Sequence, residues 1–404
     1  MIAADVVVVG AGPAGAAAAI TLARAGRSVV VVDRARFPRD KCCGDGLTTL
    51  ALRELEALGL APDSLPSWKG VDAAWVRSPS GRAVEFPLPA LGTFAAVVPR
   101  MELDASLVDL ARAAGAKVHD GHAVTGADTA EPERIVVDAD GLGPVTAHYA
   151  IGADGMWSPL RKAMGAAEPG YRGEWHAFRQ YFGGVSGSAA ERLWVWFERD
   201  LLPGYAWSFP LPGGRANVGF GILRGGRVEV GDMAQRWPDV LARPHVRAAL
   251  GADAEPEAPH KAWPIPARVD RATLGRGRAL FVGDAAAATD ALTGEGIGQA
   301  LLTGRLAAEA VLAAGATEPL RAQEGYAHAV RHHLLADHRM SVALGRLLAH
   351  EKAARGAVRV AGATPWTRRN FARWLFEDEP RAIALTPRRW HRHLLARPGA
   401  FLTH

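Results

Sequence analysis

The chain opens with two apolar runs of different composition, separated by a short glycine-containing break. Residues 5–9 read Asp-Val-Val-Val-Val, a β-branched run that suits a strand buried on both faces. Residues 13–25 are rich in alanine and include Ile20 and Leu22, which suits a packed helix. Because a second apolar strand follows at residues 28–32, the pattern predicts a parallel α/β unit at the start of the chain.

Glycines occupy the break between the first strand and the helix. They form the pattern Gly10-x-Gly12-x-x-Gly15, and the second strand ends at Asp33. In this setting Gly10 makes a tight turn, Gly12 lets a pyrophosphate approach the backbone, and Gly15 lets the helix pack closely. Asp33 can accept a hydrogen bond from a ribose hydroxyl, and the helix N-terminus favours phosphate. The residues expected to form this dinucleotide site, for FAD or NAD(P), are Gly10, Gly12, Ala14, Gly15, Asp33 and Arg34.

Two later motifs each place an aspartate after an apolar strand. Asp154 lies in the segment 150–161, and Asp284 ends the segment 279–284. The second segment leads through Thr293-Gly-Glu-Gly into an alanine- and leucine-rich stretch that predicts a long helix. A carboxylate there can accept a hydrogen bond from a ribityl hydroxyl, and the start of the helix can stabilise negative charge on a reduced isoalloxazine ring. This arrangement favours a bound flavin.

Taken in order and spacing, these motifs resemble the aromatic-hydroxylase class of flavoproteins, which is typified by p-hydroxybenzoate hydroxylase. The pattern Arg100-x-x-x-Asp104-x-x-Leu107 also matches that class, where the arginine lies along the FAD. The resemblance implies that FAD is bound without a covalent link. Beyond the opening site, the FAD-binding residues that it implies are Cys43, Gly44, Arg100, Asp154, Gly283, Asp284, Gly294, Gly296 and Ile297.

Within this class the chain resembles most the geranylgeranyl reductase family. The family's features occur as residues 37–47 (Phe-Pro-Arg-Asp-Lys-Cys-Cys-Gly-Asp-Gly-Leu), as Tyr205-x-Trp207-x-Phe209-Pro210 with Gly219-x-Gly221 after it, and as Thr293-Gly-Glu-Gly. The likeness spans residues 4 to about 315. It implies an enzyme that reduces carbon–carbon double bonds of a prenyl, polyprenyl or similar apolar substrate.

The resemblance implies an α/β fold in which a Rossmann-like FAD-binding domain of the p-hydroxybenzoate hydroxylase type is interrupted by an antiparallel β-sheet substrate domain. Helices are expected to follow at the C-terminal end. We expect the FAD-binding domain at 1–75, 98–170 and 268–325, the substrate domain at 76–97 and 171–267, and a C-terminal helical region with a basic tail at 326–404.

Four residues are candidates for the catalytic site. The counterpart of Cys43 faces the catalytic cavity in the reductase family, whereas the alternative for a thiol in such a loop is an inert buried cysteine. Tyr205, Trp207 and Phe209 recur at every second residue, so on a strand they share one face. Spacing alone favours an ordinary sheet core, but the family motif places these aromatics at the wall of the substrate pocket. We therefore expect all four at the reacting cavity.

Three functions are compatible with these motifs. The favoured one is a reductase in which FAD delivers hydride to a double bond. Its donor is NAD(P)H or another reductant, and any NAD(P)H binds transiently because the sequence has no second dinucleotide pattern. The alternative is an FAD-dependent monooxygenase that hydroxylates an aromatic or natural-product substrate; halogenation is less favoured, because the halogenase motif Trp-x-Trp-x-Ile-Pro is not matched. The third is a non-catalytic flavin-bearing electron-transfer or binding protein.

Composition excludes a disordered or fibrous chain. Of the 404 residues, 49% are hydrophobic and 22% are charged, which is the balance of a globular protein with a sizeable core. The net charge of +5 is concentrated near the C-terminus, where residues 353–404 hold ten arginines against Glu377, Asp378 and Glu379. This basic tail is expected to be a solvated face packed on the FAD domain or a peripheral membrane contact toward a lipid substrate. A nucleic-acid partner is not expected, since no binding module is recognisable.

Cysteine and histidine spacing predicts no metal site. Cys42 and Cys43 are adjacent and no second pair exists, so zinc is not expected. His328, His332, His333 and His338 fall on one predicted helix without the acid of an HExxH motif, and we interpret them as a solvated, partly amphipathic face. The first apolar run is short, contains Asp5 and lacks a basic leader, so we expect a cytoplasmic protein whose membrane contact, if any, is peripheral.

Overall fold

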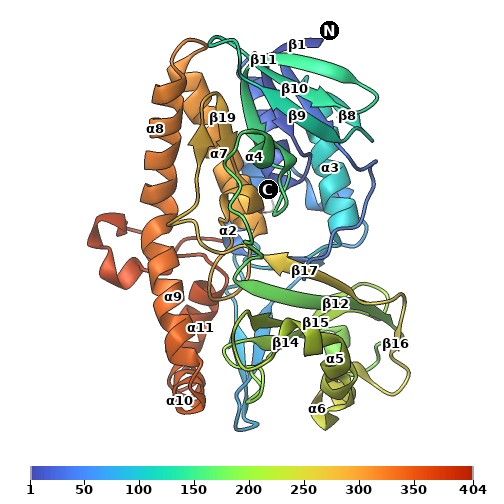
Figure 1. The fold of residues 1–404 in the computed structure, drawn as a ribbon. Coiled ribbons are helices and arrows are strands. Elements are labelled where there is room, and N and C mark those ends of the chain that lie inside the picture. Colours follow the sequence, from blue (N-terminus) through green and yellow to red (C-terminus); the bar gives the residue numbers. More distant parts are fainter. Residues whose placement is uncertain (1, 403–404) are drawn as a thin grey trace.

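The structure is a computed structural model that describes residues 2–402, and its first eight-stranded sheet lies in the upper half of Figure 1. The strands of this sheet are β1 (Ile2–Val9), β2 (Val29–Asp33), β8 (Lys117–Asp120), β9 (Val124–Asp128), β10 (Ile135–Ala139), β11 (Gly143–Gly152), β18 (Gly275–Arg276) and β19 (Ala279–Phe281). Their order is β18-β19-β11-β1-β2-β8, and β10 and β9 extend from β11. The strand-helix-strand unit predicted at the start of the chain is present, with β1 pairing in parallel with β2.

The opening valines are buried on both faces of this sheet, as their sequence predicts. Val6 and Val8 pack with the helices on one face, and Val7 and Val9 pack with β9, β10 and β11 on the other. All four are at most 3% exposed. A β-branched run without polar interruption is stable only in such a central position, because an open face would leave its side chains in water.

The second sheet occupies the lower half of Figure 1 and also has eight strands. These are β5 (Ala73–Arg77), β6 (Ala83–Pro87), β12 (Trp175–Gly183), β13 (Leu193–Trp196), β14 (Tyr205–Leu211), β15 (Arg215–Leu223), β16 (Glu255–Pro256) and β17 (Lys261–Ile265). Its order is β16-β12-β15-β14-β13-β5-β6, with β17 paired to β12. The pairs are antiparallel as expected, except that β13 and β5 run in parallel. The boundary expected at residue 75 falls inside β5.

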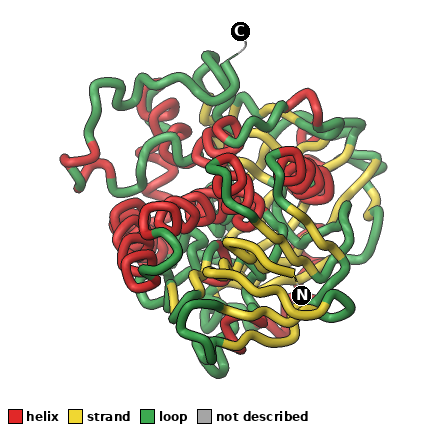
Figure 2. Tube along the Cα trace, turned by 90° about the horizontal axis from the view of Figure 1, so that it is seen from above, coloured by secondary structure: helices red, strands yellow, loops and turns green. Residues whose placement is uncertain are grey.

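Helices fill the space beside the strands, as Figure 2 shows from above. The helices are α1 (Pro13–Arg24), α2 (Thr49–Ala57), α3 (Arg100–Ala113), α4 (Pro159–Ala163), α5 (Met233–Ala242), α6 (Pro244–Leu250), α7 (Ile297–Ala314), α8 (Pro319–Val330), α9 (Ala336–Leu348), α10 (Glu351–Ala361) and α11 (Pro365–Leu375). A small third sheet joins β3 (Gly46–Leu47), β7 (Ala96–Val97) and β4 (Lys69–Gly70). Neither this sheet nor the helices α5 and α6 were anticipated from the sequence.

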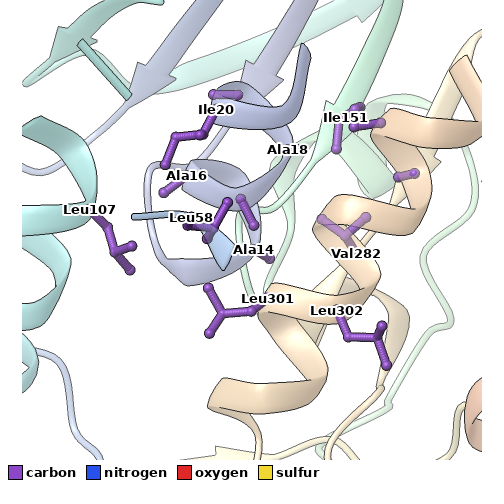
Figure 3. Packing of buried hydrophobic residues seen from close by; sticks show 14 of the residues in the cluster. Ala14, Ala16, Ala18, Ile20, Leu58, Leu107, Ile151, Val282, Leu301 and Leu302 are labelled. Carbon is purple, nitrogen blue, oxygen red and sulfur yellow. The ribbon is translucent and has the colours of Figure 1, made fainter. Parts of the chain in front are cut away.

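Helix α1 packs directly against α7, and small residues make this contact possible. A Cβ placed on Gly304 of α7 would lie 2.0 Å from the carbonyl oxygen of Ala14 in α1. The alanines of α1 present little side chain to α7, and Leu301 of α7 lies beside Ala14 (Figure 3). Helix α7 is apolar and long enough to cross a membrane, but 67% of it is buried inside the structure, which identifies it as a core helix.

The C-terminal region begins with a nearly continuous helix, in which α8 and α9 are joined by a π-helical turn at Arg331–Leu335. His328 and His332 are exposed here as expected, but His338 is only 6% exposed and its Nε2 lies 3.0 Å from Asp270 Oδ1. The interpretation of all four histidines as a solvated face is therefore wrong for His338, because the helix turns that residue toward the body of the protein.

The basic tail is only partly a solvated face. After Leu375, the described part of the chain forms short 3-10 turns rather than further α-helix. Arg373 is 4% exposed and pairs with Asp378 at 2.6 Å, and Arg53 of α2 pairs with the same carboxylate at 2.5 Å. Arg381 is likewise 4% exposed. The tail is thus anchored to the body by buried ion pairs, while most of its other arginines remain at the surface.

The α1–α7 contact predicts opposite effects for one substitution at two helical glycines. Gly304→Ala should lower the free energy of unfolding by about 1–3 kcal/mol, because the added methyl group overpacks against the Ala14 carbonyl. Gly356→Ala in α10 should raise it by about 0.5–1 kcal/mol, since that Cβ would meet no atom within 4 Å. Urea denaturation of both variants tests this. Equal shifts in the same direction would contradict the packing constraint.

Candidate active site

A cavity of about 920 Å³ lies where the two sheets face each other. One side is formed by the β1–α1 turn, the end of β2 and the start of α7. The other side is formed by β12, β14 and β17, and the loop of residues 39–46 closes it. Ligands of open α/β sheets bind at the carboxyl ends of the strands, and this cavity has that position relative to β1 and β2.

The β1–α1 turn forms one end of the cavity. Gly10 has φ 98°, and a Cβ there would lie 2.4 Å from the Ala153 carbonyl oxygen. Gly15 is a packing residue rather than a lining residue, since its Cβ would lie 1.8 Å from the Gly10 oxygen. Gly12 faces open space, and no side chain within residues 2–402 caps the N-terminus of α1. The free N–H groups of that terminus fit a phosphate.

Two arginines stand opposite this helix terminus. A Cβ placed on Gly12 would lie 3.6 Å from Arg39 Nη2 and 3.9 Å from Arg100 Nη2. The Asp104 carboxylate holds both guanidinium groups, since it contacts Arg100 twice at 2.7 Å and Arg39 at 2.6 Å. Burial opposes the charge of Arg100, but Asp104 raises its pKa above the ordinary value. Arg100 was predicted from the sequence, whereas Arg39 was missed although it lies in the 37–47 motif.

Asp33 lines the cavity together with Arg34 and Ala14. Its Oδ2 accepts a hydrogen bond from the Ala11 N–H at 2.7 Å, and its Oδ1 accepts one from the Ala35 N–H at 2.8 Å. A carboxylate has about four acceptor positions, so each oxygen retains one for a ribose hydroxyl. The two backbone contacts fix the orientation of the side chain before any ligand arrives.

Asp154 and Asp284 line the middle of the cavity. Asp154 Oδ2 accepts a hydrogen bond from the Leu160 N–H at 2.9 Å, but its buried Oδ1 has no partner among the described residues. Burial raises the pKa of Asp154 to about 6. A buried acceptor without a donor is costly, so this oxygen fits a ligand that supplies a hydroxyl or N–H group. Gly283, with φ 58°, brings the turn against Ala14.

The start of α7 forms the other end of the cavity. Gly294, Gly296 and Ile297 line it, and no side chain in the described part of the chain caps the backbone N–H groups at the start of α7. Two uncapped helix N-termini, those of α1 and α7, therefore open into the same cavity. Together with the unpaired Asp154 oxygen, they fit a ligand with a diphosphate at one end and a ring that becomes negatively charged at the other, as FAD does.

The predicted aromatic residues form one wall near α7. Tyr205, Trp207 and Phe209 lie on one face of β14, with consecutive ring centroids 6.1 Å apart, and all three line the cavity. Trp207 fits because residue 219 is glycine: a Cβ there would lie 2.3 Å from the indole ring. Trp207 is 6% and Phe209 is 7% exposed, so the strand contributes to the core and to the cavity wall at once.

The cysteines in the 39–46 loop are neutral thiols. Cys43 lines the cavity beside Gly44, and its Sγ accepts a hydrogen bond from the Asp45 N–H at 3.4 Å. Burial raises the pKa of Cys43, and it raises the pKa of Cys42 to about 11. A thiol in this state shapes the wall rather than acting as a nucleophile.

Asp45 is a buried anchor of this loop that sequence reasoning missed. It is 0% exposed with φ 64°, and its Oδ2 accepts hydrogen bonds from Tyr181 Oη at 2.5 Å and Asn217 Nδ2 at 2.8 Å. Burial raises the pKa of Asp45 to about 6. Asn217 also accepts a hydrogen bond from Trp207 Nε1 at 3.1 Å, so the loop and the aromatic wall share one network.

Lys41 is a second residue that was missed. It lines the cavity, its Nζ lies 3.4 Å from the centroid of the Trp263 ring, and burial lowers its pKa to about 8. The only sequence signal for Lys41 and Asp45 was their position in the 37–47 motif. Their partners come from β12, β15 and β17, which no local pattern connects to that loop.

The open space at Gly12 predicts a selective loss of cofactor. Gly12→Val should fold normally, since its Cβ has no neighbour closer than 3.6 Å, but its methyl groups would occupy the space that a phosphate needs. We expect FAD affinity to fall at least about tenfold, which corresponds to about 1.4 kcal/mol. Flavin absorbance of the purified protein measures this, with melting of the FAD-free variant as the control for folding. Undiminished FAD content would contradict this placement of the diphosphate.

Comparison with known proteins agrees with this reading of the cavity. Residues 3–303 match the model of a family described as FAD binding domain. The chain is 38% identical over 354 residues to the menaquinone reductase of Mycolicibacterium smegmatis, and the alignment covers 80% of this chain and 81% of that one. It is 34% identical over 311 residues to digeranylgeranylglycerophospholipid reductase 2 of Methanopyrus kandleri, which covers 76% of each chain.

A solved structure shares the fold. A geranylgeranyl bacteriochlorophyll reductase-like protein from Thermoplasma acidophilum superimposes with a TM-score of 0.77 at 20% identity, over 96% of this chain and 100% of that one. The fold is therefore of the p-hydroxybenzoate hydroxylase type predicted from the sequence, and FAD is the cofactor that the family binds. The chain belongs to the FAD-binding family that its sequence matches and, within it, to the geranylgeranyl reductase family of FAD-dependent oxidoreductases.

Proposed function

We propose that this oxidoreductase reduces carbon–carbon double bonds in the prenyl chain of an apolar lipid. The observation that carries the proposal is the aromatic wall of Tyr205, Trp207 and Phe209, which lines the cavity near the start of α7. Relatives named menaquinone reductase and digeranylgeranylglycerophospholipid reductase support it, because both names designate lipids and the second specifies a prenyl chain.

In this proposal each end of FAD has its own binding groups. The α1 terminus, Arg39 and Arg100 would hold the diphosphate, and Asp33 would hold the adenosine ribose. Asp154 and Asp284 would bind polar groups between the two ends, and the α7 terminus would face the flavin ring. FAD, once reduced, supplies a hydride equivalent at this ring. With the boundary expected at residue 75 moved to the start of β5, the segments 1–72, 98–170 and 268–325 are assigned to FAD binding, and 73–97 and 171–267 to substrate binding.

The protein itself would orient the substrate and exclude water from the aromatic wall. A prenyl double bond has no polar group to hold, so the substrate must be positioned by shape and by contact with the aromatic rings. The neutral Cys43 thiol and the glycines at 44 and 46 leave this wall smooth and close to Phe209, whose Cε2 would lie 3.0 Å from a Cβ on Gly46. Excluding water there prevents side reactions at the reacting carbons.

The electron donor in this proposal is NAD(P)H, which binds transiently. The cavity carries a single glycine-rich dinucleotide turn, and we assign that turn to FAD. The donor would then approach the flavin ring from the substrate side and leave before the lipid enters.

The proposal also includes a membrane contact through the basic tail. Leu347, Val360, Trp366, Leu385 and Trp390 are each more than half exposed. Exposed arginines, among them Arg369, Arg388 and Arg392, lie in the same part of the chain. Tryptophan and arginine together favour the interface of an anionic bilayer, which would hold a lipid substrate. The enzyme would thus be a cytoplasmic protein that associates peripherally with a membrane.

Anaerobic turnover tests the reductase function. The protein should be reduced by NADPH or NADH without oxygen, and a prenyl lipid should then reoxidise it and gain two hydrogens, as seen by flavin absorbance and mass spectrometry. Trp207→Ala should lower kcat/KM about tenfold or more, because the wall loses its largest ring. Trp194→Ala, which removes an indole stacked on Trp196 away from the cavity, is the matched control and should retain turnover. Reoxidation that requires oxygen and adds it to the product would overturn the reductase assignment.

Vesicle flotation tests the membrane contact. The protein should float with anionic vesicles at low salt, and binding should weaken as salt screens the arginines. Replacing Trp366 and Trp390 by alanine should reduce flotation without changing FAD content, since both indoles are exposed. Equal flotation of the variant and the parent protein would contradict a role for this surface.

A further inference from the structure

A group of three carboxyls and one guanidinium lies at the start of α7, where Glu295 is partly buried and lines the cavity. Asp290 and Glu295 come from the loop before α7, whereas Glu377 and Arg381 come from the tail after α11. The side chain of Arg381 is only 2% exposed, and it lies 3.9 Å from Asp290 Oδ2 and 3.6 Å from Glu377 Oε1. One cation cannot balance three neighbouring carboxylates, so at least one carboxyl is favoured in its neutral form.

Asp290 is the carboxyl best suited to carry a negative charge. Its Oδ1 accepts hydrogen bonds from the backbone N–H groups of Leu292 and Thr293 at 3.0 and 2.8 Å, and from Thr293 Oγ1 at 2.9 Å. Its Oδ2 accepts one from Ser341 Oγ at 2.6 Å. Burial opposes ionisation, but Arg381 and these donors keep the pKa of Asp290 below its ordinary value. Of the three carboxyls, Asp290 is therefore the one that the Arg381 guanidinium and the hydrogen-bond donors best stabilise in its charged form.

Glu377 is held by two side chains, Thr48 at the N-cap of α2 and Gln299 in α7. Thr48 Oγ1 donates to its Oε2 at 2.8 Å, and Gln299 Nε2 donates to its Oε1 at 2.8 Å. Burial raises the pKa of Glu377. This carboxyl does not line the cavity. Its contacts keep it behind the wall, where it acts on its neighbours through its charge.

Glu295 differs from both in its surroundings. Within residues 2–402 neither of its carboxyl oxygens accepts a hydrogen bond, and its side chain lines the cavity. A Cβ on Gly46 would lie 3.7 Å from Glu295 Oε1 and 3.0 Å from Phe209 Cε2, so the carboxyl and the aromatic wall flank one point. Burial, Glu377 and Asp290 together raise the pKa of Glu295 to about 8, against the opposing effect of Arg381.

The other acidic groups at this wall are poorer proton donors. Tyr205 donates its hydroxyl hydrogen to the Thr293 carbonyl, and burial raises its pKa. The pKa of the Cys43 thiol is also raised by burial. Lys41 is held over the Trp263 ring and interacts with Asp284 rather than with the aromatic wall. Asp45 has a pKa raised to about 6, but both its oxygens already accept hydrogen bonds, from the Arg100 N–H, Tyr181 Oη and Asn217 Nδ2. A general acid is most effective when its pKa lies near the working pH and its proton is free to transfer, and at the aromatic wall Glu295 meets both conditions.

We propose that Glu295 is the general acid that protonates the substrate carbon during double-bond reduction, an inference that rests on the proposed function. One alkene carbon would receive the hydride equivalent, with its electron pair, that reduced FAD supplies when bound. The π electrons of the alkene take a proton from the Glu295 carboxyl, whose O–H bond breaks as a C–H bond forms at the other carbon. The product has gained two hydrogens, and the carboxylate left behind recovers its proton from water once the product departs.

Single-turnover kinetics test this assignment in the FAD-loaded enzyme. The Glu295→Gln variant should bind FAD normally, and its bound FAD should be reduced by the donor at the normal rate. Reoxidation of that FAD by the substrate under anaerobic conditions should slow by about 10²–10⁴-fold. The wild-type rate should fall as pH rises through about 8, because the acid form of Glu295 is lost there. Glu309→Gln, on the exposed end of α7, is the matched control and should leave both the rate and the pH profile unchanged.

Two further readouts separate proton donation from a structural role. Glu377→Gln removes a like charge, so the alkaline fall in rate should move to lower pH. Infrared spectra of the substrate-free holoenzyme at neutral pH should contain a protonated-carboxyl band that Glu295→Gln abolishes. If wild-type enzyme is not reoxidised by any prenyl lipid, the proposed function fails. If it is, but Glu295→Gln matches its rate and pH profile, or Lys41→Met alone abolishes turnover, Glu295 is not the acid.

Discussion

The close approach of α1 to α7 is the constraint on which the site depends. Only a glycine at position 304 lets the backbone of α7 reach the Ala14 carbonyl, and only a glycine at position 15 lets α1 reach the β1 turn. Because the two helices pack at this distance, their N-termini open into one cavity instead of two. A single elongated ligand can therefore satisfy both sets of free N–H groups. The small residues of the core thus determine the spacing of the binding groups.

The cavity combines an end held by two arginines with an end walled by aromatic rings. Near the β1–α1 turn, Asp104 holds Arg39 and Arg100 in place, which keeps two positive charges where phosphate would lie. Near α7, burial favours the uncharged forms of Cys43 and Glu295 beside three aromatic rings. Charge at the first end stabilises a charged ligand, whereas the aromatic rings at the second suit an apolar one. The polarity gradient matches a cofactor with a diphosphate at one end and a lipid-facing ring at the other.

Local sequence patterns predicted the parts of this protein that are local in the structure. The β1–α1–β2 unit, its glycines and the alternating aromatics of β14 follow from residues within a few positions of one another. Arg39, Lys41 and Asp45 were missed because their roles arise from partners far along the chain, such as Asp104, Trp263 and Tyr181. Glu377 could not be found at all, since only the folded tail brings it beside α7. The parallel pairing of β13 with β5 is likewise a long-range result.

The tail that supplies Glu377 and Arg381 lies outside the family match, which ends at residue 303. The groups that we assign to FAD lie within that match, while two of the four charges behind the aromatic wall do not. Two of the residues that set the acidity of Glu295 are thus encoded outside the stretch that holds the FAD groups and Glu295 itself. Changes in the C-terminal residues could therefore alter the pKa of Glu295 during evolution while the flavin site stays unchanged. Exchanging the C-terminal segments of two relatives would reproduce such a change in the laboratory.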